Sequence, residues 1–244
     1  MRLAPGLHRL GNGLVNTYLV EEAGEVTIVD AGVPGYWGDL GTELATMGRT
    51  IDDVRALVLT HGHSDHIGFA ERFRRDRGIV PRIHELDAAL ARGEVKNPSR
   101  GLGPFRIGPL LRFLVYGARK GALRITTLGE VAGFGDGATL DVPGALRAIH
   151  VPGHTPGSAA LHAAGLGILF VGDALATKAV TTGEEGPMIA PFTADAKEAV
   201  TSLGRLESIE AAWVLPGHGQ PWQGGTAEAV RLVRERVAAS AATT

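Results

Sequence analysis

Four short apolar segments, far apart in the chain, each lead into a turn that carries histidine or aspartate. Residues 56–59 run directly into a loop with three histidines, and the other three segments lead to His154, Asp173 and His218. A short, continuous apolar run is typical of a strand buried on both faces of a sheet. The carboxyl ends of such strands are where α/β proteins place their sites. The chain is therefore expected to form buried strands whose ends carry a polar site.

The loop after the first segment is the strongest candidate for chemistry. His61, His63 and His66 follow one another closely, with Asp65 between the last two. In an extended segment His61 and His63 point the same way and reach one ion, whereas Asp65 and His66 follow a turn and face a second ion. Imidazole and carboxylate together suit Zn²⁺, Fe or Mn²⁺ better than Ca²⁺ or Mg²⁺. With the three later turns, the side chains are sufficient for two metal ions that share one carboxylate.

Predicted strands and helices alternate along both halves of the chain. Strands are expected at residues 14–20, 26–29, 56–59, 79–83, 145–151, 158–162, 167–171 and 213–215. Helices are expected at residues 69–77, 85–91, 196–206 and 226–238, and another ends near Gly48. This alternation predicts an α/β or mixed α+β protein in which helices cover at least one sheet. Residues 181–191, rich in glycine and proline, are expected to form a loop along the cleft.

Composition excludes several classes of protein. The chain has 24 Lys and Arg against 26 Asp and Glu, a net charge of −2, so no nucleic-acid partner is expected. Cysteine is absent, which excludes disulfides, thiolate nucleophiles and Fe–S clusters. Neither a signal peptide nor a membrane span is predicted, and the expected location is cytoplasmic.

Residues 94–130 interrupt the alternation with a basic and apolar insertion. Seven Lys and Arg, Arg100 among them, stand against two acidic residues, so the segment carries +5 and leaves −7 for the rest of the chain. The segment is expected to be helical in part. Three interpretations are open: a packing element, a lid or pocket wall over an anionic or acyl-bearing substrate, and an oligomer contact or membrane-surface helix.

The chain resembles the metallo-β-lactamase-fold hydrolases, which include hydroxyacylglutathione hydrolases, acyl-homoserine lactonases, tRNA 3′-processing nucleases and the metallo-β-lactamases. The resemblance rests on the His-x-His-x-Asp-His pattern of residues 61–66, followed in order by His154, Asp173 and His218, and it extends over nearly the whole chain. It implies one domain over residues 1–244. Its fold is a four-layer αβ/βα sandwich, in which two sheets face each other, helices cover the outside and the metals lie at one edge.

The same resemblance implies a role for each candidate residue. The implied ligands are His61, His63 and His154 for the first metal, Asp65, His66 and His218 for the second, and Asp173 as the bridge between them. Two divalent ions, with Zn²⁺ expected and Fe or Mn²⁺ as alternatives, hold a hydroxide that attacks the substrate. Asp65 orients this nucleophile and passes a proton to the leaving group.

The expected activity is hydrolysis of a small ester, lactone or thioester, so the expected partner is a small molecule. One alternative is a phosphodiesterase or nuclease on the same two ions. The other is a mononuclear iron oxidoreductase similar to the persulfide dioxygenases. The absence of cysteine and the presence of Asp173 disfavour antibiotic hydrolysis. Formation of a homodimer is left open by the sequence.

Three further residues are weaker candidates for the site. His84, just after the strand at residues 79–83, is a candidate for its mouth, and Tyr116, on the insertion, is a candidate substrate contact. Asn16 begins the first strand, and two roles are open for it: approach to the metals or stabilisation of a turn.

Overall fold

The N-terminal half of the chain builds one sheet. The computed structural model describes residues 1–99, 101, 103–124 and 126–242, so Arg100 of the basic insertion lies outside the described residues. Within them, seven strands pair in chain order, antiparallel from β1 to β4 and parallel from β4 to β7. The strands are β1 (Arg2–Ala4), β2 (Leu7–Gly11), β3 (Asn16–Glu22), β4 (Glu25–Val29), β5 (Val54–Val58), β6 (Arg82–His84) and β7 (Ala132–Phe134).

The C-terminal half builds a second sheet, in which four strands of the described chain lie in the order β13–β10–β9–β8. β13 is parallel to β10, whereas β8, β9 and β10 pair antiparallel. A separate hairpin joins β11 to β12. These strands are β8 (Arg147–His150), β9 (Ala159–Ala163), β10 (Ile168–Gly172), β11 (Ala176–Lys178), β12 (Glu185–Met188) and β13 (Trp213–Pro216).

Alternating side chains on β3 build two layers of core, because successive residues of a strand point to opposite faces. Tyr18 and Val20 face the second sheet and belong to the core that it shares with the first. The rings of Tyr18 and Phe170 lie 5.6 Å apart across this interface. Leu19 points the other way, into a core shared with the helices. The two sheets therefore pack face to face.

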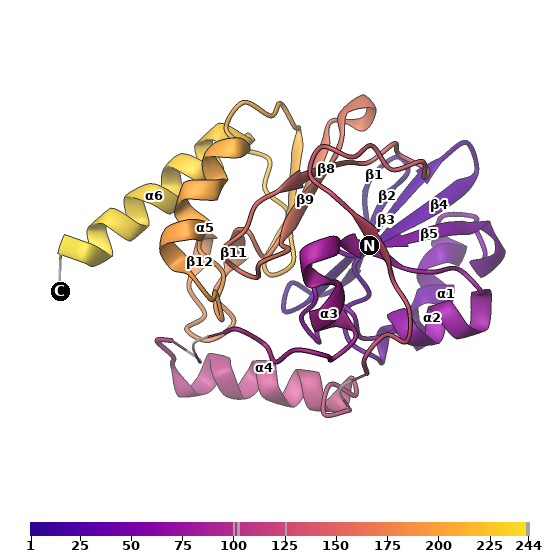
Figure 1. Ribbon diagram of the computed structural model, residues 1–244, viewed down its shortest axis with the longest axis horizontal. Coiled ribbons are helices and arrows are strands. Elements are labelled where there is room, and N and C mark those ends of the chain that lie inside the picture. Colours follow the sequence, from indigo (N-terminus) through magenta and orange to yellow (C-terminus); the bar gives the residue numbers. More distant parts are fainter. Residues whose placement is uncertain (100, 102, 125, 243–244) are drawn as a thin grey trace.

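Helices cover both outer faces of the paired sheets. Leu40 of α1 (Tyr36–Thr46) and Phe73 of α2 (Ala70–Arg77) pack against the first sheet, and Val230 of α6 (Thr226–Ala242) packs against the second. Figure 1 shows α5 (Ala196–Ser202) and α6 on one side of the molecule and α1 and α2 on the other. The predicted αβ/βα sandwich is confirmed. Short helical segments complete the chain: α3 (Ala88–Ala91) and 3-10 turns at Ile51–Asp53, Glu85–Asp87, Ala164–Leu166 and Leu203–Arg205.

The basic insertion contains one helix, α4 (Ile107–Arg119), as expected of a segment that is helical in part. The backbone N–H of Arg106, just before the helix, donates to the carbonyl of Thr181, and the carbonyl of Lys120, just after it, accepts from the N–H of Gly35. Because these partners come from the two halves of the chain, α4 bridges both halves (Figure 1). No described helix is both long and apolar enough to cross a bilayer.

Some local predictions were wrong. Residues 181–191 are not a simple loop, because Glu185–Met188 forms β12 and pairs with β11. Gly186 and Pro187 hid this strand, since both residues are depleted in strands. The helix predicted at residues 196–206 ends at Ser202 and continues as a 3-10 turn. Strands β1, β2, β7 and β11 were not predicted, because they are short and β11 alone among them has a β-branched residue, Thr177.

Candidate metal centre

The loop after β5 brings three histidines into the interior of the protein. His61 and His66 are fully buried and His63 nearly so. The backbone N–H of His66 donates to the carbonyl of His63, which closes a turn, and the carbonyl of His66 accepts from the N–H of Ala31. The loop is thus fixed against the end of β4, beside the interface of the two sheets.

The other three ligand-bearing turns converge on this loop. His154 follows β8, Asp173 follows β10 and His218 follows β13. Nε2 of His154 lies 2.9 Å from Nδ1 of His63, and Nε2 of His218 lies 3.1 Å from Oδ2 of Asp173. Three groups of potential ligand atoms result among the described residues: His61, His63 and His154; His61, His66 and Asp173; and Asp65, His66 and His218. All seven residues predicted as ligands lie in this one cluster, and their role as ligands stays a prediction.

Several polar atoms in the cluster are buried without a hydrogen-bond partner. These atoms are Nε2 of His61, Nε2 of His66 and Oδ1 of Asp173. A buried polar atom without a partner is costly, and a cation between such atoms removes that cost. Imidazole nitrogen and carboxylate oxygen are suitable ligands for Zn²⁺, Fe and Mn²⁺. The residues present therefore fit divalent metal ions.

Hydrogen bonds on the outer side of the rings orient the histidines. Nδ1 of His66 donates to Asp30 over 2.9 Å, and Nδ1 of His61 donates to Oγ1 of Thr60 over 3.1 Å, because the hydroxyl proton of Thr60 is already given to Asp30. Nδ1 of His218 donates to the carbonyl of Leu14. Such contacts fix the tautomer and leave the opposite nitrogen free for a metal.

His154 and His63 follow the same arrangement. Nδ1 of His154 donates to Oγ1 of Thr193 over 3.0 Å, which leaves Nε2 facing the cluster. His63 is reversed, since its Nε2 donates to Oδ1 of Asn97 over 3.0 Å and its Nδ1 faces His154. In each of the five histidines, one ring nitrogen is held and the other faces the cluster.

Asp87 holds two of the ligand-bearing loops together. This fully buried carboxylate accepts from the backbone N–H groups of Gly62 and Gly157 and from Oγ1 of Thr155. It therefore joins the loop of residues 61–66 to the turn that carries His154. Neither Asp87 nor Asp30 was predicted as a functional residue. For Asp30, the available signal in the sequence was its position at the end of an apolar strand.

Asn16 stabilises the turn that carries His218. Its amide nitrogen donates to the carbonyls of Pro216 and Gly219, and its Oδ1 accepts from the N–H of Gly13. Of the two roles left open for Asn16, these contacts support the stabilisation of a turn.

Burial and mutual charge shift the pKa values of the cluster in opposite directions. Burial lowers the pKa of His154 to about 3 and that of His61 well below its usual range. Burial also opposes the charged form of His66, but the nearby carboxylates, with Asp173 foremost, raise its pKa to about 10. The pKa of Asp173 is held well below its usual value, against the effect of burial, by His218 and His66. Asp173 is thus ionised and able to share its two oxygens.

The two weaker candidates lie beside the cluster rather than in it. His84 is buried, and its ring stacks on that of His150 with centroids 4.3 Å apart. The hydroxyl of Tyr116 lies 2.6 Å from that of Tyr36 and belongs to the packing of α4 on the first core. Neither residue belongs to the three ligand groups of the described chain. Their contact with substrate remains a prediction.

An apolar cavity of about 270 Å³ opens beside the cluster. His63 and Asp65 line one part of it, and Phe113, Leu114 and Ala118 of α4 line another. The ring of Phe113 lies 6.1 Å from that of His218. The cavity therefore places apolar walls next to the potential ligand atoms.

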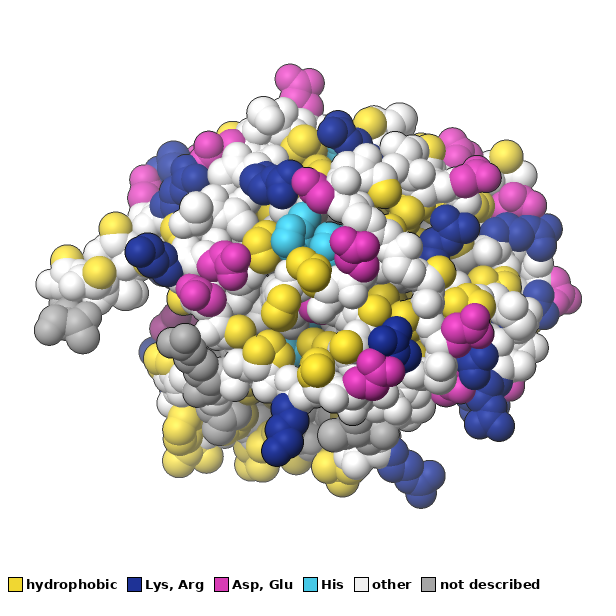
Figure 2. All heavy atoms as spheres, viewed as in Figure 1, with side chains coloured by type: hydrophobic (Ala, Val, Ile, Leu, Met, Phe, Trp, Pro, Cys, Tyr) yellow, Lys and Arg dark blue, Asp and Glu magenta, His cyan; other side chains and the backbone are white. Residues whose placement is uncertain are grey.

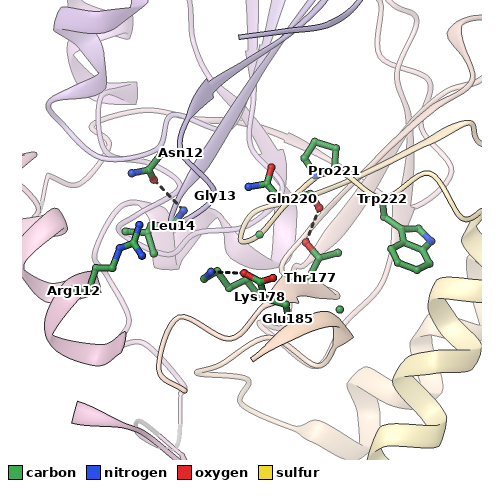
Figure 3. Close-up of a pocket in the computed structure, with 12 residues that line it drawn as sticks. Asn12, Gly13, Leu14, Arg112, Thr177, Lys178, Glu185, Gln220, Pro221 and Trp222 are labelled. Atoms are coloured by element: carbon green, nitrogen blue, oxygen red, sulfur yellow. Dashed lines mark hydrogen bonds and ion pairs between the residues drawn. The ribbon is translucent and has the colours of Figure 1, made fainter. Parts of the chain in front are cut away.

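A second pocket, of about 220 Å³, is lined in part by Gly219 and Gln220, the two residues that follow His218 (Figure 3). Its lining includes Arg112 of α4, Gln220 and Trp222. Figure 3 shows Lys178 directed at Glu185, with which it forms an ion pair of 2.7 Å. Arg112 forms no ion pair with a described residue, so the pocket carries an uncompensated positive charge.

This fold, with clustered histidines and aspartates at the ends of its strands, defines a class of metal-dependent proteins. The family model described as the metallo-beta-lactamase superfamily matches residues 10–218. The chain belongs to this superfamily.

Three similar proteins illustrate how far the likeness extends. The probable metallo-hydrolase YflN of Bacillus subtilis is 26% identical over 238 residues, which cover 91% of this chain and 86% of YflN. The crystal structure of TTHA1429, a metallo-beta-lactamase family protein from Thermus thermophilus, is 30% identical with a TM-score of 0.70, covering 98% of this chain and 81% of that one. TTHA1623, solved in a di-iron-bound form, is 26% identical with a TM-score of 0.61, covering 89% of this chain and 93% of that one. The chain is thus similar over most of its length to proteins of the metallo-hydrolase superfamily.

Proposed function

We propose that the protein hydrolyses a small ester, lactone or thioester with the help of two divalent metal ions. The observation that carries this proposal is the apolar cavity, which shares His63 and Asp65 with the metal cluster. An acyl group in that cavity has its carbonyl carbon beside the potential ligand atoms. Apolar walls with a few convergent polar groups are typical of small-molecule sites.

His61, His63 and His154 would hold one ion, Asp65, His66 and His218 the other, and Asp173 would lie between them. Bound divalent ions lower the pKa of water and polarise a carbonyl oxygen. Zn²⁺ is the proposed metal, and the di-iron form of TTHA1623 supports iron as the alternative.

Asp65 is the carboxylate of the cluster that also lines the cavity. Its Oδ2 lies 3.4 Å from Nε2 of His218, and it lines the cavity wall. His66 and His218 lower the pKa of Asp65 although burial raises it, so the carboxylate is ionised and able to accept a proton. We assign to the carboxylate of Asp65 the proton that leaves the attacking water and passes to the leaving group.

The test compares kcat/KM for lactones, thioesters and p-nitrophenyl esters of increasing acyl length with that for bis(p-nitrophenyl) phosphate, using protein loaded with Zn²⁺ or Mn²⁺. We expect carbonyl substrates to be preferred, with a rate that rises with acyl length. Phe113→Ala should lower kcat/KM for the longest acyl substrate by about tenfold relative to that for the shortest, because it removes a wall of the cavity. Phe105→Ala is the matched control, since Phe105 is exposed and does not line the cavity. A phosphodiester preference, or equal rates for all acyl lengths, would contradict the proposal.

Phosphodiester hydrolysis is the second candidate, and the positive charge of Arg112 in the second pocket favours it. If it is correct, Arg112→Gln raises KM for bis(p-nitrophenyl) phosphate, because the phosphate loses a cationic partner. Arg119→Gln, an exposed arginine on the same helix that does not line this pocket, should leave KM unchanged. An unchanged KM in Arg112→Gln would remove the observation that supports this candidate.

The mononuclear iron alternative is tested by His218→Ala. Only one of the two proposed ions depends on His218, so an enzyme with one ion keeps its activity in this variant, whereas the dinuclear hydrolase loses it by orders of magnitude.

A further inference from the structure

The outward face of α4 is apolar although it faces solvent. The side chains of Ile107, Leu111 and Leu114 are 78%, 57% and 54% exposed, and Val115 is exposed as well. Their spacing of i, i+4, i+7 and i+8 places them in one stripe along the helix. A contiguous apolar surface of this kind marks a site of interaction.

This outer stripe is part of a wider apolar surface. Phe105 before the helix and Leu123 after it are also exposed. Figure 2 shows hydrophobic side chains gathered along the lower edge of the molecule, where Figure 1 places α4. A helix of this length provides a surface of about 20 Å.

The charge next to the outer stripe is positive. Residues 95–129 contain neither Asp nor Glu. Arg112 and Arg119 are exposed, and their helical positions place both along one edge of the stripe. Arg106, at the start of the helix, is exposed too, although it lies 3.9 Å from Glu184.

Two kinds of surface fit an apolar stripe: a second copy of this chain and a lipid membrane. Charge distinguishes between them. A second copy docked symmetrically through α4 presents the same patch, so Arg112 and Arg119 meet like charges. Anionic lipid headgroups complement both arginines, while the apolar side chains enter the region beneath the headgroups. The observations therefore favour the lipid surface.

We infer that α4 binds flat to the surface of an anionic lipid membrane, through the apolar stripe and its flanking arginines. Leu114 belongs to the stripe and also lines the cavity that borders His63 and Asp65. Docking through α4 therefore places that side of the cavity next to the lipid. An amphiphilic ester dissolved in the membrane then has a direct route to the cluster, and this last point rests on the proposed function.

The test measures co-sedimentation of the full chain with vesicles of phosphatidylcholine alone and of phosphatidylcholine mixed with phosphatidylglycerol. We expect binding to the mixed vesicles only, weakened by added salt. The double variant Ile107→Ser with Leu111→Ser should reduce the affinity by more than about tenfold, because two side chains lose their burial in lipid. Leu166→Ser with Val237→Ser is the matched control, since both residues are exposed and lie on other elements.

Vesicle binding requires no turnover, so its outcome is independent of the proposed hydrolysis. No binding to the mixed vesicles, or equal binding by the double variant, would overturn the inference. A dimer seen by sedimentation velocity without lipid, and abolished by the double variant, would assign the stripe to a second copy instead.

Discussion

Asp30 holds two histidines of the cluster in place. Its backbone has a φ of 61°, a left-handed conformation that non-glycine residues seldom adopt. In this conformation its carboxylate accepts from the N–H and the hydroxyl of Thr60 and from Nδ1 of His66. One carboxylate thus orients His66 directly and His61 through Thr60. Asp30 is a positioning residue, since both rings depend on it for their direction.

Asp30→Asn should weaken metal binding by about 10- to 100-fold, because the amide cannot accept from all of these donors. Competition with a chromophoric chelator measures the affinity. Asp76→Asn is the control, since Asp76 is an exposed residue of α2 whose partner is Arg72. An affinity equal to that of the unchanged protein would show that Asp30 does not orient the ligands.

At the scale of elements, the turn after β13 fits closely around the cluster. A Cβ atom on Gly217 would lie 2.3 Å from Oδ1 of Asp173 and 2.4 Å from Cε1 of His66. Glycine at this position is therefore what allows the turn to approach two ligand side chains. The turn is further held by the hydroxyl of Tyr18, which donates to the carbonyl of Pro216.

Gly217→Ala should lower the bound metal per chain, because Asp173 or His66 must move away from the added methyl group. Gly165→Ala is the matched control, since a Cβ there meets open space. Metal analysis by inductively coupled plasma mass spectrometry, with the melting temperature of both variants, checks the prediction. Full metal content in Gly217→Ala would contradict the close approach of the turn.

At the scale of the whole molecule, the buried histidines make the stability of the metal-free protein depend on pH. The folded-state pKa of His154 is about 3 and that of His61 is also low, whereas both are near 6.5 in the unfolded chain. Below pH 6.5 the unfolded chain binds protons that the folded protein does not, so the free energy of unfolding falls as the pH is lowered. His66 acts in the opposite direction. Because its pKa is raised in the folded protein, its contribution to stability is complete below pH 6.5 and is lost as the pH rises towards 10.

Urea unfolding of chelator-treated protein between pH 4.5 and pH 10 checks this prediction, with the highest stability expected near neutral pH. A constant free energy of unfolding between pH 6.5 and pH 4.5 would contradict it. The metal-loaded protein should show the same decline shifted to lower pH, because metal ions compete with protons for the histidines.

The sequence was informative wherever a local pattern determined the structure. The alternation of strands and helices predicted the layers, and the four ligand-bearing turns were visible because each follows an apolar run. The partners of Asp87 and Asn16 were not predictable, because they depend on how the two halves pack. The amide of Asn16, for example, bonds a carbonyl 200 residues further along the chain. β12 was missed for a different reason, since Gly186 and Pro187 give it a weak strand propensity that its pairing with β11 outweighs.

The hydrogen bond from His63 to Asn97 joins the cluster to the segment that leads into α4. Asn97 lines the apolar cavity, and its Oδ1 holds the ring of His63 from the side opposite the cluster. A molecule that fills the cavity and restrains Asn97 therefore also restrains His63. Such a link is reciprocal, since each ligand strengthens the binding of the other by the same factor. We therefore expect a bound metal to be retained most firmly while the cavity is filled and to exchange most readily when the cavity is empty.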